Sequence, residues 1–409
     1  MRSPRVELVV IGDELISGRV VDTNSAFVSR ALADIGLVPD RIVKIGDDLD
    51  TIKYATSQAV SRSDIVFVLG GLGPTPDDKT MEAVSESFGW HLFSDRRALN
   101  RIGRFFKKQE KKVPSLARRQ ALVPQGAVTF DNPVGMVPGM AVEYKGTSII
   151  LLPGVPIELK TILTQSIMPF LKEHFQTRAF YSMQFRTFGI PEATIASRLK
   201  RVARGYSDAV FAYYPRVTGV DVVIRAKARR KLASLKKRIL GLLGSAVYEV
   251  GQRSIEEVLG KLLRKTNLKL ATAESCTGGL ISDMITNVPG SSDYYQGGVI
   301  AYSNAVKMHL LGVKKRTLER YGAVSNQTVR EMAKGVCIQL DADVGIAVSG
   351  IAGPGGATQK KPVGLVYIGV AVRDRIKVGK HRFNGNRMMV KQRTAMAALD
   401  LCRRMLETD

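Results

Sequence analysis

The stretch RVELVVIG, residues 5–12, is an apolar run that ends on a glycine, and it sets the fold class of the N-terminal part of the chain. A segment with helical apolar spacing (23–36) follows it. Two further apolar runs, VPDRIVKIG (38–46) and DIVFVLGG (64–71), then enclose a second helical segment (48–63). Strands that alternate with helices in this way predict a parallel sheet with helices on both faces. We therefore expect an α/β domain whose ligands bind at the carboxyl ends of its strands.

The sequence pattern changes twice farther along the chain. The segment TSIILLPGVPIELK (147–160) closes the first domain with a strand, a proline-bracketed turn and a helix. Short strands with period-two alternation then surround one helical segment, which predicts a small α+β domain at 178–250. A second α/β pattern follows and ends in an amphipathic helix. We therefore predict three domains, at 1–177, 178–250 and 251–409.

Composition narrows the class of protein. The chain has no run of 18 apolar residues and does not start like a signal peptide, so we expect no membrane span and a cytoplasmic location. Its three cysteines (Cys276, Cys337 and Cys402) form no CxxC pair, which favours a reducing compartment and disfavours a zinc site.

The net charge of +24 attracts anions such as nucleotides. Basic residues concentrate at 96–119 and 225–240, where they form either solvated helix faces, which we favour, or phosphate-attracting surfaces. No nucleic-acid motif accompanies them, so we expect neither a nucleic-acid partner nor a membrane partner.

Glycine, proline and acidic residues gather in three segments of the first domain: IGDELISGRVVDTN (11–24), GGLGPTPDDKT (70–80) and LLPGVPIE (151–158). Glycines let the backbone approach a ligand, and N–H groups at a helix start bind phosphate. A divalent cation such as Mg²⁺ on Asp77 and Asp78 would remove the repulsion between these carboxylates and a phosphate. The alternative is that the aspartates only cap a helix, which explains one such residue but not the whole set. Further candidate binding residues are Asp13, Glu14, Asn24, Gly70, Gly71, Gly73 and Thr75.

In the C-terminal domain, ATAESCTGGL (271–280) places Ser275 between a predicted strand and a predicted helix. A serine in such a turn is exposed near helix N–H donors, which stabilise an oxyanion; the alternative is a hydroxyl that only caps the helix. None of the four histidines lies in a motif-like setting, so a buried lysine is the candidate base. IAYSNAVKMHLLGV (300–313) offers Lys307, although an exposed lysine beside the core residue Tyr302 is the alternative there.

Two more segments of the C-terminal domain carry polar groups that fit an anionic ligand. AVSGIAGPGGAT (347–358) is a glycine-rich turn after a buried strand, and its N–H groups and the Ser349 hydroxyl fit a phosphate or an oxyanion. FNGNRMMVKQR (383–393) opens the last helix with Arg387, which fits a phosphate clamp.

The motifs of the first domain, together with RRQALVPQGA (118–127) and NPVGMVPG (132–139), resemble the N-terminal domain of the CinA family of competence/damage-inducible proteins. That domain is similar to molybdopterin-binding proteins. The resemblance implies a metal-dependent ADP-ribose pyrophosphatase in which Asp77 and Asp78 hold the metal, while Asp13 and Glu14 orient water. The chain departs from the family pattern at 136–137, where Met and Val replace a small pair.

The motifs AESCTGG, YSNxxK, SGIAGPGG and KPVGLVY, over about 254–405, resemble the C-terminal CinA domain, the nicotinamide mononucleotide deamidase family. The resemblance implies a metal-independent deamidase with Ser275 as nucleophile and Lys307 as its base. Tyr302 and Ser349 would line the site, with Ser349 in the place of the usual Thr. Substrate-binding candidates are Thr277, Gly278, Gly279, Gly350, Gly353, Gly355 and Arg387, which here follows Asn386 instead of the usual Asp.

The resulting expectation is an α/β protein with a molybdopterin-binding-like three-layer domain, an α+β middle domain and an α/β deamidase domain. We expect a cytoplasmic hydrolase that acts on nicotinamide mononucleotide and on ADP-ribose, and the resemblance implies a homodimer. One alternative is a nucleotide- or molybdopterin-binding protein linked to competence or DNA damage, with vestigial sites. Another is a molybdopterin-processing enzyme, which the deamidase-like domain disfavours.

Overall fold

The computed structural model describes residues 4–108, 110–175 and 181–408, and it divides into two compact units, Met1–Tyr181 and Ser182–Asp409. The predicted domain boundary at 177/178 lies outside the described residues. None of the helices in the described ranges combines the length and apolarity needed to cross a membrane.

The elements of the first unit alternate between strands and helices over residues 6–69 as the sequence predicts, whereas four of them at 122–152 are consecutive strands. In chain order they are β1 (Val6–Ile11), α1 (Asp13–Ile16), α2 (Asn24–Asp34), β2 (Pro39–Ile45), α3 (Leu49–Arg62), β3 (Ile65–Leu69), α4 (Thr80–Phe88), β4 (Leu92–Ser94), α5 (Arg96–Lys108), α6 (Ser115–Arg119), β5 (Leu122–Pro124), β6 (Val128–Phe130), β7 (Gly139–Tyr144), β8 (Thr147–Leu152), α7 (Pro156–Ile162), the π-helical turn η1 (Leu163–Ile167) and α8 (Met168–His174).

A six-stranded sheet in the order β2-β1-β3-β8-β7-β6 forms the centre of this unit. β2, β1, β3 and β8 run parallel, whereas β7 and β6 pair antiparallel with their neighbours. The parallel pairing predicted for the strands at 5–12, 38–46 and 64–71 is therefore confirmed, and β7 and β6 add an antiparallel edge. β7 and β8 are joined by a tight turn at 145–146, which allows only an antiparallel pair.

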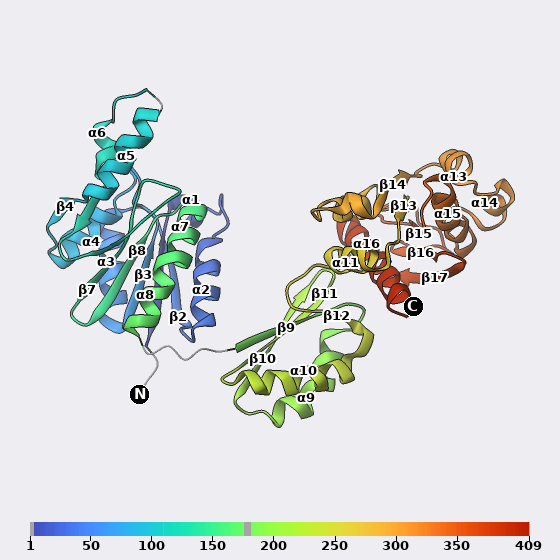
Figure 1. The fold of residues 1–409 in the computed structure, drawn as a ribbon, viewed down its shortest axis with the longest axis horizontal. Helices are drawn as coiled ribbons and strands as arrows, with labels where there is room; N and C mark the ends of the chain where they lie inside the picture. Colours follow the sequence, from blue (N-terminus) through green and yellow to red (C-terminus); the bar gives the residue numbers. More distant parts are fainter. Residues whose placement is uncertain (1–3, 109, 176–180, 409) are drawn as a thin grey trace. The chain divides into compact units, whose positions relative to one another are not determined.

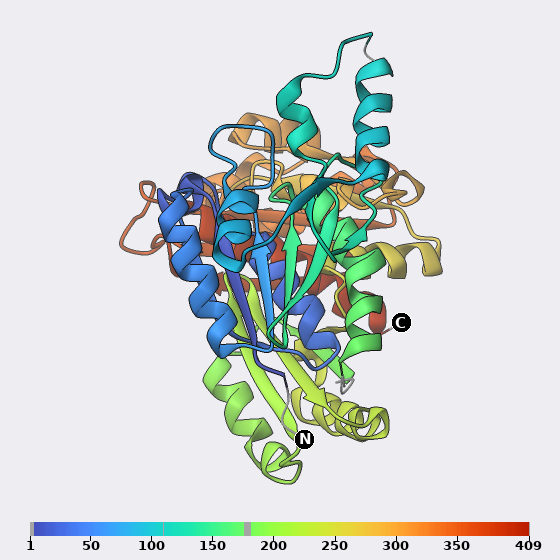
Figure 2. The ribbon, with the colours of Figure 1, turned by 90° about the vertical axis from the view of Figure 1, so that its left-hand side faces the viewer.

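Helices cover both faces of this sheet, as Figure 1 shows. α2 and the continuous α7–η1–α8 segment bury one apolar cluster, and α3 and α4 bury another on the opposite face. The Asp48 side chain begins α3 by accepting a hydrogen bond from the Thr51 N–H. α5 and α6, drawn in cyan in Figures 1 and 2, extend away from the sheet and share a small apolar cluster of their own.

The second unit begins with an α+β segment. Its elements are β9 (Tyr181–Thr187), α9 (Glu192–Arg204), β10 (Ala209–Arg216), β11 (Gly219–Ala226), α10 (Arg229–Leu243), the 3-10 turn η2 (Gly244–Ala246) and β12 (Val247–Val250). The sheet order is β10-β11-β9-β12, and α9 and α10 pack together over a shared apolar cluster.

The C-terminal part is again α/β. Its elements are α11 (Ile255–Thr266), β13 (Leu270–Glu274), α12 (Leu280–Thr286), the 3-10 turn η3 (Ser291–Asp293), β14 (Tyr295–Ile300), α13 (Asn304–Leu311), α14 (Lys315–Tyr321), α15 (Asn326–Gln339), β15 (Val344–Gly350), β16 (Leu365–Val372), β17 (Arg375–Arg382) and α16 (Arg387–Glu407). The sheet order is β14-β13-β15-β16-β17. α11, α12 and α16 bury one face, and α13, α14 and α15 bury the other.

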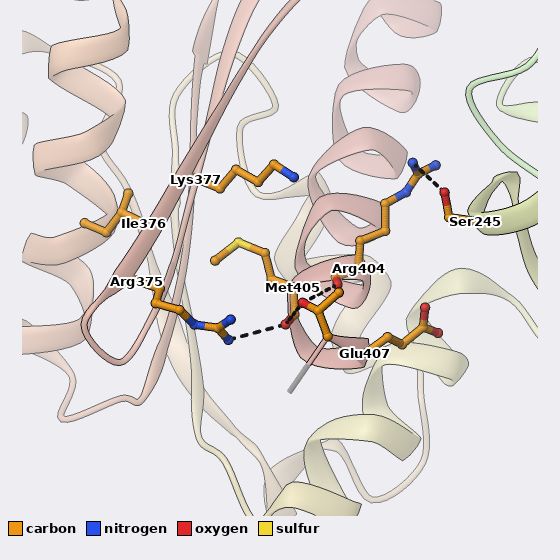
Figure 3. A pocket seen from close by; sticks show the side chains of 8 residues that line it. Ser245, Arg375, Ile376, Lys377, Arg404, Met405 and Glu407 are labelled. Atoms are coloured by element: carbon orange, nitrogen blue, oxygen red, sulfur yellow. Dashed lines mark hydrogen bonds between the residues drawn. The ribbon is translucent and has the colours of Figure 1, made fainter.

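Polar contacts join the end of α16 to the turn between α10 and β12. Arg403 is only 2% exposed; it donates to the Ser245 carbonyl at 2.8 Å and to Asp400 at 2.8 and 3.0 Å. Arg404 donates to the Ser245 hydroxyl at 3.2 Å, as Figure 3 shows. A cavity of about 720 Å³ lies at this seam. Asp400 pairs with the buried Arg403 within α16, and the bond from Arg403 to the Ser245 carbonyl ties the end of this helix to the turn.

Candidate functional site

Ser275 and Lys307 meet in the C-terminal part of the chain. β13 ends at Glu274, so Ser275 lies at the carboxyl edge of a parallel strand pair, where ligands bind in such sheets. Lys307 projects from α13, which Ser303 begins by accepting from the Val306 N–H. The Lys307 Nζ atom lies 3.2 Å from the Ser275 Oγ atom, and the two residues are 1% and 9% exposed.

The surroundings of Lys307 favour an uncharged amine. Its Nζ atom donates to the carbonyls of Ala301 at 2.7 Å and Tyr302 at 3.2 Å, so a neutral amine would have its lone pair free for the serine hydroxyl. Burial lowers the pKa of Lys307, and no ion pair in the described ranges involves it. The alternative of an exposed helix lysine beside a core tyrosine does not hold: Lys307 is buried, and Tyr302 is 64% exposed.

Cys276, next to the serine, does not compete with it as a nucleophile. Burial raises the pKa of the Cys276 thiol to about 12, which keeps it protonated at neutral pH. The thiol nevertheless lines the same cavity as Ser275 and therefore shapes the space around the serine.

The carboxylate of Glu274 occupies the start of α12. It accepts from the N–H groups of Gly279, Ile281 and Ser282 at 3.0, 3.1 and 2.8 Å, and from the Ser282 hydroxyl at 2.7 Å. The helix donors that sequence reasoning offered to an oxyanion are therefore already used by a side chain. Glu274 stands in the AESCTGG motif, but a glutamate that ends a strand gives no sequence signal for a bond to the following helix.

A cavity of about 270 Å³ lies in front of the serine. Eight of the predicted residues line it: Ser275, Tyr302, Lys307, Ser349, Gly350, Gly353, Gly355 and Arg387. Thr277, Gly278 and Gly279 do not. Thr277 is fully buried, and the two glycines, both at positive φ, form the turn into α12. These three residues therefore shape the turn that carries Ser275.

Arg387 joins three segments at the mouth of this cavity. It donates to the Gly353 carbonyl at 2.7 Å and to the Tyr302 hydroxyl at 3.3 Å. Asn386 caps α16 by accepting from the Met389 N–H at 3.0 Å, so the side chain in the place of the family aspartate still supports Arg387. Ser349 donates to the Ala323 carbonyl at 2.8 Å.

The glycine-rich segment at 70–78, which we call the glycine loop, is closely packed between β3 and α4. Gly71 has φ +65°, and a side chain there would collide with the Thr80 hydroxyl, which donates to the Gly70 carbonyl at 2.9 Å. Asp78 accepts from the N–H and the hydroxyl of Thr75 through one oxygen and so closes the loop on itself. Asp78 therefore has a structural role within the loop, but it does not cap α4, whose start carries no side-chain cap, and its second oxygen accepts none of these bonds.

Carboxylates from three loops face one another beside this glycine loop. Asp13 and Asp47 exchange hydrogen bonds through their backbone N–H groups at 2.8 and 3.2 Å. Burial raises the pKa of Asp47, and the charges of Asp13, Glu14 and Asp77 raise it further. Asp47 was missed in the sequence; its signal is the GDD run (46–48) directly after β2. The expected pair of Asp13 and Glu14 thus belongs to a larger acidic group.

The carboxylates beside the glycine loop fit a cation that is held jointly with substrate phosphates better than a metal that is held by protein ligands alone. Among the described residues, no three His, Cys, Asp or Glu side chains converge as a protein-only site requires. Mg²⁺, however, is often held by one or two carboxylates plus substrate phosphates. Asp77 and Asp47 fit that arrangement, because their negative charges act on each other and a cation would offset both.

The remaining predicted residues of the first unit hold its turns. The Asn24 amide donates to the Gly154 carbonyl at 2.7 Å and so ties α2 to the PGVP turn, while its own Oδ1 atom is buried without a partner. Val137, in the place of a family small residue, is buried in the core, and its carbonyl accepts from Asn132. Gly73 lies so close to the Asp78 carboxylate that a side chain there would displace it.

Three family models match the chain in succession. They describe a probable molybdopterin binding domain at residues 7–173, a damage-inducible protein CinA KH domain at 182–249 and a CinA C-terminal domain at 252–406. The chain is 40% identical over 404 residues to a competence-damage inducible protein of Caldicellulosiruptor bescii, covering 97% of this chain and 98% of the relative. It is 39% identical over 408 residues to a CinA-like protein of Kosmotoga olearia, covering 98% and 99%.

Solved structures match a smaller part of the chain. The competence/damage inducible protein CihA of Agrobacterium tumefaciens is 36% identical, with 39% of this chain and 99% of that chain covered and a TM-score of 0.36. A CinA protein of Thermoplasma acidophilum is 33% identical, with 42% and 97% covered and a TM-score of 0.38. With relatives at 40% identity that match almost end to end, this chain belongs to the CinA family of competence/damage-inducible proteins.

Proposed function

We propose that the C-terminal part of the chain hydrolyses the carboxamide of nicotinamide mononucleotide to nicotinic acid mononucleotide and ammonia. One observation carries the proposal: a buried lysine amine 3.2 Å from a serine oxygen at the edge of a cavity. Serine needs a base to act as a nucleophile, and a desolvated lysine is such a base. The Arg387 guanidinium at the mouth of the cavity is suited to the substrate phosphate.

The reaction follows from these positions in two halves. Lys307 takes the hydroxyl proton of Ser275, and the serine oxygen forms a bond to the carboxamide carbon. The C–N bond then breaks, and the proton held by Lys307 goes to the departing nitrogen, which leaves as ammonia. In the second half, Lys307 takes a proton from water, the resulting hydroxide attacks the acyl carbon, and Ser275 recovers its proton. Atoms and charge balance without a further reactant.

Ammonia release from nicotinamide mononucleotide tests this proposal. We expect Ser275→Ala and Lys307→Met each to lower kcat by roughly 10³-fold or more, because both belong to one catalytic unit. Lys314→Met, an exposed lysine that begins the next helix, is the matched control and should keep full activity. Full activity in Ser275→Ala, or no activity in the unmodified chain, would contradict the proposal.

We further propose that the first unit hydrolyses ADP-ribose to AMP and ribose 5-phosphate. Water adds to one phosphorus of the diphosphate, and the bond to the bridging oxygen breaks. A divalent cation, when bound, supplies neutralisation of the charge that develops on the phosphate oxygens. Asp77 and Asp47 would hold it with the substrate, and Asp13 and Glu14, whose charges act on Asp47, would orient water. The glycine loop lets the diphosphate approach the backbone.

Product analysis with and without added Mg²⁺ tests the second activity. We expect chelation to abolish hydrolysis and Asp77→Asn to lower it by about 10²-fold or more. Asp50→Asn replaces a carboxylate that is 92% exposed on α3 and serves as the control. Metal-independent hydrolysis would refute the assigned role of Asp77. If both units bind nucleotides but neither turns them over, the binding-protein alternative holds.

Light scattering tests the homodimer that the family resemblance implies.

A further inference from the structure

A second cavity, of about 310 Å³, adjoins the glycine loop of the first unit. It shares Gly71, Gly73 and Asp78 with the proposed ADP-ribose site and extends from them along α4 toward β4 and β5. Its volume is at the small end of the range for ligand pockets, which suits one ring system better than a whole dinucleotide. The cavity thus continues the proposed phosphate site on one side.

The walls of this cavity are apolar and aromatic, and its charged groups are mostly acidic. Trp90 lines it together with Leu72, Met81, Leu92 and Leu122. Trp90 is partly buried and packs against the Phe88 ring at 5.1 Å and the Tyr144 ring at 6.5 Å between centroids, which holds the indole in place. A fixed, partly exposed indole in an apolar pocket is suited to stacking against a flat ring.

The charged side chains decide which end of a nucleotide fits. Asp78, Glu82 and Glu86 line the cavity with Arg119, so carboxylates outnumber cations there. Glu86 is paired with Lys53, and Arg119 lies 3.8 Å from Glu82. A neutral ring with an N–H donor suits this part of the cavity, because carboxylates only accept hydrogen bonds.

We propose that this cavity is a nucleobase subsite, in which the base stacks against Trp90 and donates an exocyclic amino group to the carboxylates at the rim. The inference rests on the proposed ADP-ribose activity and names the feature that selects its substrate: an amino-bearing base such as adenine. A base-free sugar phosphate would bind only at the glycine loop. A base with a carbonyl in the place of the amino group would set its carbonyl oxygen against a carboxylate. Both groups only accept hydrogen bonds, so such a base should bind more weakly.

Tryptophan fluorescence tests the subsite directly, because Trp90 is the single tryptophan of the chain. Selective excitation therefore reports only on this cavity, whatever ligands bind elsewhere. We expect AMP to change the emission of the full-length protein in a saturable way. Ribose 5-phosphate and nicotinamide mononucleotide should leave it unchanged. IMP, which lacks the amino group, should bind about tenfold more weakly than AMP.

Variants separate stacking from a general effect on folding. Trp90→Ala should weaken AMP binding, measured by calorimetry, by about tenfold or more, and Trp90→Phe should restore most of it. Phe93→Ala removes an exposed aromatic side chain from β4 that does not line the cavity, and it should bind AMP as the unmodified chain does. If Trp90→Ala does not fold, the fluorescence titration of the unmodified chain remains decisive.

The outcomes distinguish this subsite from the proposed activity. If AMP binds by calorimetry without altering Trp90 emission, or if ribose 5-phosphate alters it equally, the subsite is refuted even when ADP-ribose is hydrolysed. If AMP does not bind at all, the subsite is also refuted. A saturable, AMP-specific change in a protein that releases no product supports the subsite and refutes only the hydrolysis.

Discussion

Replacement of Glu274 by alanine should unfold the turn that carries Ser275. The glutamate is 1% exposed, and its carboxylate accepts hydrogen bonds from three backbone N–H groups and one hydroxyl. In Glu274→Ala these donors lose their acceptor in a buried region. Each orphaned N–H costs about 1–2 kcal/mol, so the three together should lower the free energy of unfolding by about 3–6 kcal/mol. Glu274→Gln retains one acceptor oxygen and should lose roughly half as much.

Hydrogen exchange locates the effect, because global unfolding of a chain with two units is not one transition. We expect the amides of residues 279–282 to be protected in the unmodified chain and to exchange rapidly in Glu274→Ala. The exchange rates of these amides under native conditions give the free energy of opening of the turn, which should fall by this amount. Ammonia release should fall as well, because Ser275 loses its fixed place beside Lys307.

Glu319→Ala is the matched control for this experiment. Glu319 lies on α14, 64% exposed, and pairs only with Lys315 at 3.7 Å, so its loss should change stability by about 0.5 kcal/mol or less. The reasoning fails if Glu274→Ala keeps the amides at 279–282 protected and loses less than about 1 kcal/mol. In that case the four hydrogen bonds would have no role in holding the turn.

Three further results are expected from the same chain. Because burial lowers the pKa of Lys307, the deamidation rate should rise with pH through that lowered pKa, which a pH–rate profile measures. The free energy of unfolding should also rise, by up to about 1.4 kcal/mol per pH unit, between the folded pKa and the higher unfolded pKa of Lys307. Lys307→Met should therefore be more stable at neutral pH and lack this pH dependence in denaturation experiments. Asn386→Ala should lose the cap of α16, which should cost about 1 kcal/mol in thermal unfolding, and it should raise KM because Arg387 is misplaced. Asn386→Asp should keep both the cap and the KM of the unmodified chain. Arg403→Ala should cost about 1–3 kcal/mol in the same thermal assay, because the Ser245 carbonyl loses its donor, while Asp400 keeps its bond from the Arg404 Nε atom at 2.7 Å.

The order of elements could be read from the sequence because its periodicity is local. The runs at 5–12 and 64–71 became fully buried parallel strands, and Asp48 and Ser254 begin α3 and α11 as their capping chemistry predicts. β6, with three residues, and β17, with an irregular burial pattern, show too little periodicity to be found. The antiparallel edges of both large sheets were not predicted, because the direction of a strand depends on its pairing and not on local composition.

The two candidate sites differ in how far the sequence could describe them. Ser275, Lys307 and Arg387 are separated by many residues, yet their types and settings identified them before their contacts were seen. Trp90 was not identified, because an isolated aromatic after a helix reads as core and only the cavity beside it suggests another role. Asp47 was not predicted, because an acidic run before a helix is equally typical of a helix cap, and its hydrogen bonds with Asp13 join loops 34 residues apart in the sequence.

Two buried ionisable side chains, Glu274 and Lys307, lie on either side of the turn at Ser275, and they differ in the hydrogen-bonding groups around them. Glu274 meets only donors, while Lys307 meets two carbonyls and a hydroxyl. Acceptor-only surroundings satisfy the N–H groups of an amine but supply no negative charge to offset the cost of burying an ammonium ion, so they favour the neutral base. The same turn directs the N-terminal donors of α12 at Glu274 and away from the cavity. In the proposed reaction these three donors therefore fix the position of the nucleophile and are not available to charge on the substrate oxygen.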